Sequence, residues 1–248
     1  MPFFCSLSQT CRQRPPASVR LTLLKLTTLN FIPYRGLTMR RTAAAVLIPA
    51  LFALSAAAQA AESTRSLPSF VAISAKGAFA MTVEVGKTQS VVVSGEDSFV
   101  AVLKTEVVDN ELRISMPDKT FKSSKSDPRI TITVPSLSRV KVEGAGETIL
   151  NKVNTDRLDI GYLGAGHLVA NGKVKYLRVN ARGVGEVDTK SLVAERVDVN
   201  FEGVGHVSVH ATDLLNAVAK GMGELDYYGH PKTVNKSVAG IGSVNARD

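Results

Sequence analysis

The sequence predicts an all-β solenoid in which coils of about 19 residues stack on one another. The first observation behind this prediction is a Gly-x-Gly triplet that recurs six times in the second half of the chain. The first glycines of successive triplets lie 20, 19, 20, 18 and 19 residues apart, and such a period is typical of one unit stacked on copies of itself. The glycines expected to form the corner turns are Gly144, Gly146, Gly164, Gly166, Gly183, Gly185, Gly203, Gly205, Gly221, Gly223, Gly240 and Gly242.

The second observation is that residues on both sides of each triplet alternate between apolar and polar. Two positions before the first glycine stand Val142, Tyr162, Ala181, Phe201, Ala219 and Val238. A period of two indicates β-strands whose alternate side chains face the core, so each repeat is predicted to be strand, tight turn, strand and loop. Gly172 lies outside the triplets, and we expect it to accept a larger side chain far better than Gly183 or Gly203.

The part of the chain before the glycine repeats, residues 66–137, lacks the period but is rich in predicted strands. The candidates are residues 70–73, 79–85, 90–94, 104–108, 111–115 and 129–134. Asp109-Asn110 is a predicted hairpin turn between two of them. We expect residues 66–137 to form the N-terminal cap and first coils, and residues 138–248 the regular coils, of a single domain that spans residues 61–248.

A signal peptide is predicted at residues 39–60. Arg40 and Arg41 precede an apolar stretch, and the small residues Ala58 and Ala60 flank Gln59 in a small-x-small cleavage pattern, so we expect cleavage after Ala60. Residues 1–38 precede this leader, which indicates a spurious extension that is not translated. The sequence therefore predicts a protein exported to the periplasm or to the cell exterior.

The net charge of +8 belongs to the predicted leader and extension. All 22 acidic residues lie at or after Glu62 and seven of the 30 basic residues lie before it, which leaves 23 basic against 22 acidic residues. This balance argues against a nucleic-acid partner. No later apolar run is long enough to span a membrane. Both cysteines, Cys5 and Cys11, lie before residue 39, so no disulfide or thiolate metal site is expected in the mature chain.

Several short motifs occur in an order that resembles a known bacterial family. They are Phe70-x-x-Ile73, Gly77-Ala-Phe, Val83-Glu-Val, Gln89-Ser-Val-Val-Val, Leu112-Arg-Ile, Ile130-Thr-Ile-Thr-Val-Pro-Ser-Leu137 and Val142-Glu-Gly-Ala-Gly146. With the glycine repeats they resemble the auto-transporter adhesin head domain, or GIN domain, over about residues 70–246. The resemblance implies a right-handed parallel β-helix with Gly-x-Gly at its turns, export, no shared catalytic set and a role in cell adhesion.

Acidic residues are spread at one or two per coil, without the paired carboxylates that polysaccharide-cleaving enzymes need. We therefore assign no catalytic residue, no cofactor and no metal. We interpret the chain as an exported, non-enzymatic module with a binding, adhesive or structural role in the cell envelope. The expected partner is a glycan or protein of the envelope or exterior, and a homo-oligomer is compatible with the sequence. Two alternatives stay open: a polysaccharide-modifying enzyme and a periplasmic binder of divalent metal.

Two surfaces are candidates for contact with a ligand. The residues just after the triplets form the predicted Glu/His column, which consists of Glu147, His167, Glu186, His206 and Glu224. In stacked coils these side chains would be neighbours, either for charge complementarity or as a divalent-metal strip. The second candidate is a patch of Tyr227, Tyr228 and His230, because one of two adjacent tyrosines in a strand should face outward.

Overall fold

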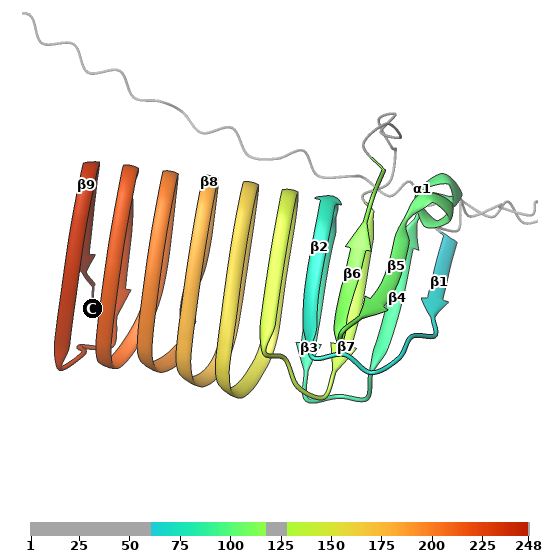
Figure 1. Cartoon of the computed structure of the whole chain (residues 1–248), viewed down its shortest axis with the longest axis horizontal. Coiled ribbons are helices and arrows are strands. Elements are labelled where there is room, and N and C mark those ends of the chain that lie inside the picture. The colour runs from blue at the N-terminus through green and yellow to red at the C-terminus, as the bar shows by residue number, and fades with distance from the viewer. Residues whose placement is uncertain (1–60, 118–127, 248) are drawn as a thin grey trace, which may run out of the picture. The chain divides into compact units, whose positions relative to one another are not determined.

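The computed structural model describes residues 61–117 and 128–247, which form nine β-strands and one short helix of a single unit (Figure 1). The strands before the glycine repeats are β1 (Ala61–Arg65), β2 (Ala72–Ala78), β3 (Ala80–Val85), β4 (Ser90–Gly95), β5 (Lys104–Val108), β6 (Glu111–Ser115) and β7 (Arg129–Val134). The helix α1 (Asp97–Val102) follows β4. The predicted extension, signal peptide and cleavage site lie outside the described residues, and Ala61 is the first residue of β1.

The glycine repeats form β8 (Arg139–Tyr228) and β9 (Thr233–Ala246). β8 is a continuous strand of 90 residues that winds round the core, so that its successive turns lie side by side between β2 and β9 (Figure 1). β9 pairs parallel to the last turn of β8, with Gly221 beside Gly240 and Gly223 beside Gly242. This register places residues 19 positions apart next to each other.

All nine strands belong to one sheet with the order β1-β4-β7-β3-β8-β2-β6-β5, and β9 pairs with β8 off this path. β2 and β3 each run parallel to β8, and they run parallel to β6 and β7 respectively. β4 runs antiparallel to both β1 and β7, and β5 runs antiparallel to β6. The sheet is therefore mixed, and it curves around one core until it nearly closes on itself.

The prediction of a right-handed parallel β-helix is wrong, because the sheet is a mixed, nearly closed structure that contains antiparallel pairs. The antiparallel pairs all lie before the glycine repeats, whereas β2 and β3 pair in parallel with the first turn of β8. The physical reason is local. Asp109 and Asn110 both have positive φ, at 53° and 59°, which gives the tight turn that reverses the chain and pairs β5 with β6 in antiparallel fashion. The glycine period carries no information about this part of the chain.

The core is a single cluster of apolar side chains inside the curved sheet. Alternation along β8 produces it: Val140, Ile160 and Val179 stand at the same place in successive repeats and are fully buried. The predicted inward position of Tyr162 and Phe201 is confirmed, since they are 5% and 4% exposed. Burial raises the pKa of the Tyr162 hydroxyl because the charged phenolate is poorly solvated there.

All six strands predicted before the glycine repeats are found, and five of them match the observed bounds to within one residue. The exception is the predicted strand at residues 70–73, because β2 begins two residues later and ends five residues later. The hairpin turn at Asp109-Asn110 is also confirmed. Sequence reasoning missed β1 and α1. A six-residue helix is too short to show the 3.6-residue period, and only Phe99 of α1 is buried.

Candidate functional site

The middle residues of the triplets form a line of exposed side chains along one corner of the stacked turns. This apolar ridge consists of Ala145, Ala165, Val184, Val204, Met222 and Ile241. Val184 is 58% exposed, Met222 is 54% exposed and Ile241 is 80% exposed, although residues of this kind are usually buried. The side chains become larger toward the C-terminal end. An exposed run of aliphatic side chains is a feature of interaction surfaces.

The glycines on either side of each middle residue create this ridge. A Cβ atom on Gly183 would lie 2.1 Å from the carbonyl oxygen of Gly164 in the preceding turn, and the φ of Gly183 is +122°. No side chain fits in so narrow a space, and other residues rarely adopt that φ. The corner backbones of successive turns can therefore approach closely, and only the middle residue of each triplet carries a side chain into solvent.

Ten of the twelve triplet glycines have positive φ, whereas Gly223 and Gly242 do not. The expectation that Gly172 accepts a larger side chain is wrong. Gly172 has a φ of +137°, and its Cβ would lie 2.0 Å from the carbonyl oxygen of Val153. The turn that contains Gly172 therefore also needs glycine at a second place, although the equivalent residue of the preceding turn is Val153 and no repeated glycine marks the position.

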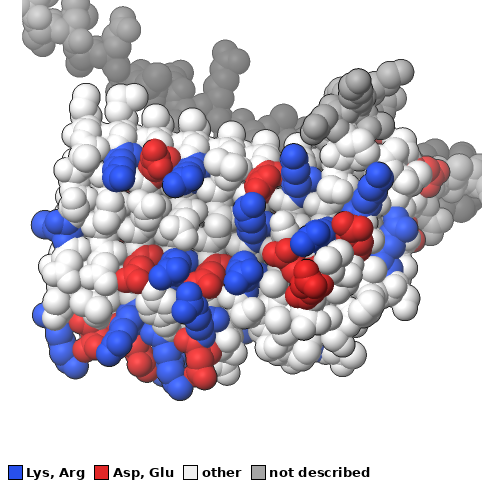
Figure 2. Space-filling model, in the orientation of Figure 1, with Lys and Arg blue, Asp and Glu red and all other residues white. Residues whose placement is uncertain are grey.

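Charged side chains of both signs lie beside the apolar ridge. Arg182 and Glu202, which precede two neighbouring triplets, form an ion pair of 3.3 Å in which both side chains are more than half exposed. Lys141 and Glu143 pair at 2.5 Å, and this contact lowers the pKa of the Glu143 carboxyl. Figure 2 shows positive and negative side chains intermixed across the face that it draws. No large field of one sign is visible there to attract nucleic acid or an anionic membrane.

The predicted Glu/His column is only partly assembled. Glu147 and Glu186 are exposed, while His167, His206 and Glu224 are half-buried. Between column members, one ion pair is found among the described residues, from His167 Nδ1 to Glu186 Oε2 at 3.3 Å. His206 instead contacts Ser208 Oγ at 2.9 Å and Asp226 Oδ2 at 3.7 Å through its Nε2 atom. The column therefore does not continue as one chain of contacts.

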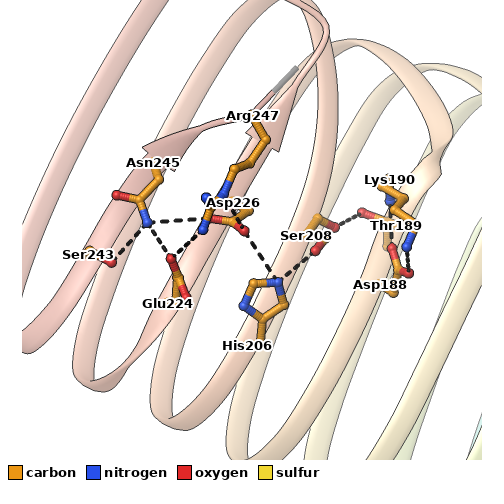
Figure 3. A network of polar contacts seen from close by, with 10 residues as sticks. All are labelled: Asp188, Thr189, Lys190, His206, Ser208, Glu224, Asp226, Ser243, Asn245 and Arg247. Atoms are coloured by element: carbon orange, nitrogen blue, oxygen red, sulfur yellow. Dashed lines mark hydrogen bonds and ion pairs between the residues drawn. The ribbon is translucent and has the colours of Figure 1, made fainter.

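The last two residues of the column, His206 and Glu224, belong to a polar network at the C-terminal turns (Figure 3). Asp226 is 5% exposed, and its Oδ2 atom accepts a hydrogen bond of 2.9 Å from Arg247 Nε. Arg247 Nη2 also donates to Glu224 Oε1 at 2.8 Å. Asn245 Nδ2 donates to the same Glu224 oxygen at 2.5 Å and lies 3.4 Å from Asp226 Oδ1. The hydrogen bond to Asp226 is the main reason that the pKa of Arg247 is raised.

The predicted patch of Tyr227, Tyr228 and His230 does not present two exposed aromatic rings. Tyr227 packs against the core, and Tyr228 is half-buried. His230 is exposed and has a φ of 50°, next to Gly229 at the loop before β9. The three residues are neighbours in the chain, and neither tyrosine is fully exposed.

A polar ladder on the outer face of β8 and β9 was missed by sequence reasoning. Asn216 Nδ2 donates to Asp198 Oδ1 at 2.7 Å, and Asn235 Nδ2 donates to Asn216 Oδ1 at 2.9 Å. Tyr176 also donates its hydroxyl to Asp198. The signal was available in the sequence, because all four residues precede triplets by five or seven positions and so stand on the same face.

An open hollow lies elsewhere on the stacked turns, lined by Asn154, Thr155, Asp156, Lys173, Val174, Lys175 and Glu195. Lys175 Nζ pairs with Asp156 Oδ1 at 2.7 Å, and this pairing raises the pKa of Lys175. The Asp156 side chain is 83% exposed, so water rather than protein surrounds the carboxylate. Such an environment does not supply the burial that tunes an acid or base for catalysis.

Comparison with protein families identifies the chain. A family described as "Putative auto-transporter adhesin, head GIN domain" matches residues 69–231, which is well over half of the sequence. This protein belongs to the GIN-domain family. The resemblance stated from the sequence motifs is therefore confirmed. No curated protein matches the GIN-domain chain significantly.

Solved structures of similar proteins include one described as an adhesin and one described as a lipid binding protein. A putative adhesin from Bacteroides fragilis is 25% identical, with a TM-score of 0.64, and the match covers 77% of this chain and 98% of that one. A putative lipid binding protein from Parabacteroides distasonis is 19% identical over 77% of this chain and 98% of that one, with a TM-score of 0.45. The family and the first of these structures support an adhesion-like role. Among the described residues, no helix has the length and apolar character needed to cross a membrane.

Proposed function

We propose that this GIN domain is a non-enzymatic adhesion module of the cell envelope, and that it binds a protein partner along the apolar ridge. The observation that carries the proposal is the exposure of Val184, Met222 and Ile241 in one line of neighbouring turns. Burial of such side chains against a partner is favourable by about 25 cal/mol for each Å² of apolar surface removed from water.

A protein fits this surface better than a glycan does. Sugar-binding sites use exposed aromatic rings as platforms, and the chain has no tryptophan. The large apolar side chains that are exposed among the described residues are all aliphatic or methionine. The intermixed charges beside the ridge, such as Arg182 and Glu202, are suited to the polar rim of a protein interface.

The proposal includes export. Translation would begin at Met39, and removal of residues 39–60 would leave Ala61 as the N-terminal residue. Mass spectrometry of the protein recovered from the periplasm or medium tests this directly, and a peptide from residues 1–38 in that material would contradict it.

Binding of the labelled protein to intact cells and to envelope extract tests the role of the ridge. We expect Met222→Asp to weaken saturable binding by at least about tenfold, because a carboxylate in the interface is costly to desolvate. Ser191→Asp is the matched control, since it adds the same charge at an exposed position outside the ridge. An equal loss in both variants would refute the ridge as the binding surface.

The chemical class of the partner is tested separately by treatment of the target cells. Protease digestion of the cell surface should abolish binding, whereas periodate oxidation of surface sugars should leave it intact. The reverse pattern would show that the partner is a glycan and that the assignment to a protein is wrong.

A further inference from the structure

Three side chains with metal-binding atoms meet on two neighbouring turns of β8 (Figure 3). His206 lies on one turn, and Glu224 and Asp226 lie on the next, so that one atom from each of the three lies within 4.8 Å of the others. No other such group of histidine, cysteine, aspartate and glutamate occurs in the part of the chain that the structure describes. The stacking of turns brings together residues 18 and 20 positions apart in the sequence.

The two carboxylates of this cluster already share one positively charged group. Two carboxylates converge, and one of them, Asp226, is 5% exposed. The Glu224 side chain is 42% exposed, and like charges so close together are unfavourable unless a positive group lies between them. The guanidinium of Arg247 has this role here, since it donates to Asp226 Oδ2 at 2.9 Å and to Glu224 Oε1 at 2.8 Å.

The donor set favours a particular class of ion. Imidazole nitrogen together with carboxylate oxygen is a common ligand set for Zn²⁺, whereas Ca²⁺ prefers six to eight oxygen atoms. Ligand atoms about 2.0–2.2 Å from a tetrahedral Zn²⁺ lie roughly 3.4 Å from one another. His206 Nε2 and Asp226 Oδ2 are 3.7 Å apart, which is close to this separation.

We propose that His206, Glu224 and Asp226 form a Zn²⁺ site, in which the ion takes the place of the Arg247 guanidinium between the two carboxylates. His206 would supply Nε2 and each carboxylate one oxygen, so that one coordination position is left for water or a ligand atom from a partner. Arg247 can move out of the site because its side chain is 47% exposed. The site does not depend on the apolar ridge or on the proposed partner.

The second column histidine provides a matched control. His167 Nδ1 lies 3.3 Å from Glu186 Oε2, and both side chains are more exposed than Asp226. His167 belongs to no group of three metal-binding side chains among the described residues. A half-buried histidine beside a single glutamate should bind Zn²⁺ only weakly.

Calorimetry with Zn²⁺ on the purified, tag-free protein tests the site. We expect one ion to bind per chain, His206→Gln to weaken this binding at least about tenfold, and His167→Gln to leave it unchanged. Arg247→Gln should tighten binding about fivefold, because it removes a competing unit charge about 4 Å away. Ca²⁺ should not compete.

Several results would overturn the site. These are a lack of Zn²⁺ binding in both the wild type and Arg247→Gln, an equal loss in His206→Gln and His167→Gln, or weaker binding in Arg247→Gln. The thermal midpoint of each variant in EDTA identifies any loss that comes from unfolding. Asp226→Asn adds a further ligand variant if it folds, and the two histidine variants and Arg247→Gln decide the question without it.

Discussion

The two ends of the sheet differ in how their edge strands pair and in what covers them. At the N-terminal end, β1 and β5 run antiparallel to their neighbours, and α1 contacts β1 and β4. At the other end, β9 pairs with β8 along one edge, and its other edge pairs with no strand among the described residues. Val238 is therefore 44% exposed, whereas Tyr162 and Phe201, which also stand two positions before a triplet, are buried. The difference follows from the repeat itself, because each added turn pairs with the turn before it and leaves its other edge unpaired.

The two regions also hold their strands together differently. The N-terminal region buries large side chains from outside its strands, namely Phe70 before β2, Phe79 between β2 and β3, and Phe99 in α1. The turns of β8 and β9 have smaller inward residues, close backbone contacts at glycine and side-chain hydrogen bonds between equivalent positions. The stability of the first region should therefore depend on apolar volume, and that of the second on backbone fit and registered polar contacts.

The largest effect is expected from a side chain at a glycine corner of β8. Gly183→Val should lower the free energy of unfolding by about 3–5 kcal/mol, since it combines an unfavourable φ with a clash against the backbone of Gly164. Gly172→Val should cost a similar amount. Denaturant unfolding measures both.

Gly161→Ala is the control for these corner variants, because the nearest atom to its Cβ would be 3.5 Å away on the Lys141 side chain. It should leave stability almost unchanged. If Gly161→Ala and Gly183→Val had equal effects, the close backbone approach would not be the reason that the corners need glycine.

The next largest loss of stability is expected when a residue in the core is truncated, and a residue at the open edge of β9 serves as the comparison. Ile132→Ala in β7 should cost about 2–5 kcal/mol, because Ile132 is fully buried and its truncation leaves a cavity. Val238→Ala in β9 should cost less than about 0.5 kcal/mol, as at other surface positions. Thermal unfolding of the two variants tests the difference. A large loss for Val238→Ala would mean that the open edge is covered in solution.

A smaller effect is expected from the polar ladder. Asn216→Ala removes the hydrogen bonds to Asp198 and Asn235 and should cost about 1–2 kcal/mol. Asn180→Ala, at an exposed position of β8, should cost less. Hydrogen exchange should show faster opening of β9 in Asn216→Ala, and unchanged protection there would count against a stabilising ladder.

The smallest effect concerns a contact between the two regions. Lys87 Nζ lies 2.7 Å from Glu84 Oε2 of β3, and Lys152 Nζ of β8 lies 3.7 Å from the same atom. These two positive charges lower the pKa of Glu84. A carboxyl group with a lowered folded pKa stabilises the fold above its unfolded pKa and loses that effect as pH falls through the folded value. The contribution should therefore fade below about pH 4.5.

Thermal midpoints between pH 3 and pH 7 test this contact. Glu84→Gln should flatten the pH dependence slightly, and Glu106→Gln, which changes an exposed glutamate, serves as the control. High salt should reduce the difference because both lysine side chains are exposed. A steeper pH dependence in Glu84→Gln would contradict the assignment.

The sequence by itself determined the strands, the family and the inward columns. Period-two alternation is a property of single strands, so it located strands such as Arg129–Val134 and the burial of Tyr162 correctly. The six triplets also marked one glycine corner in advance. Each triplet needs only a positive φ within its own turn and an equivalent triplet in the neighbouring turn, and both needs can be read from the sequence. Gly172 escaped notice because no repeated glycine marks its position.

Only the tertiary structure decided how the strands pair and which polar groups meet. The direction of pairing depends on the turns and on which edge each strand reaches, so the antiparallel partners of β4 could not be read from alternation. The same holds for His206, which meets Asp226 rather than continuing the predicted column, because side-chain contacts of a few ångströms depend on rotamers and on the path of the last turn. Arg247 reaches that cluster because β9 returns beside β8, a position fixed by packing across the whole sheet.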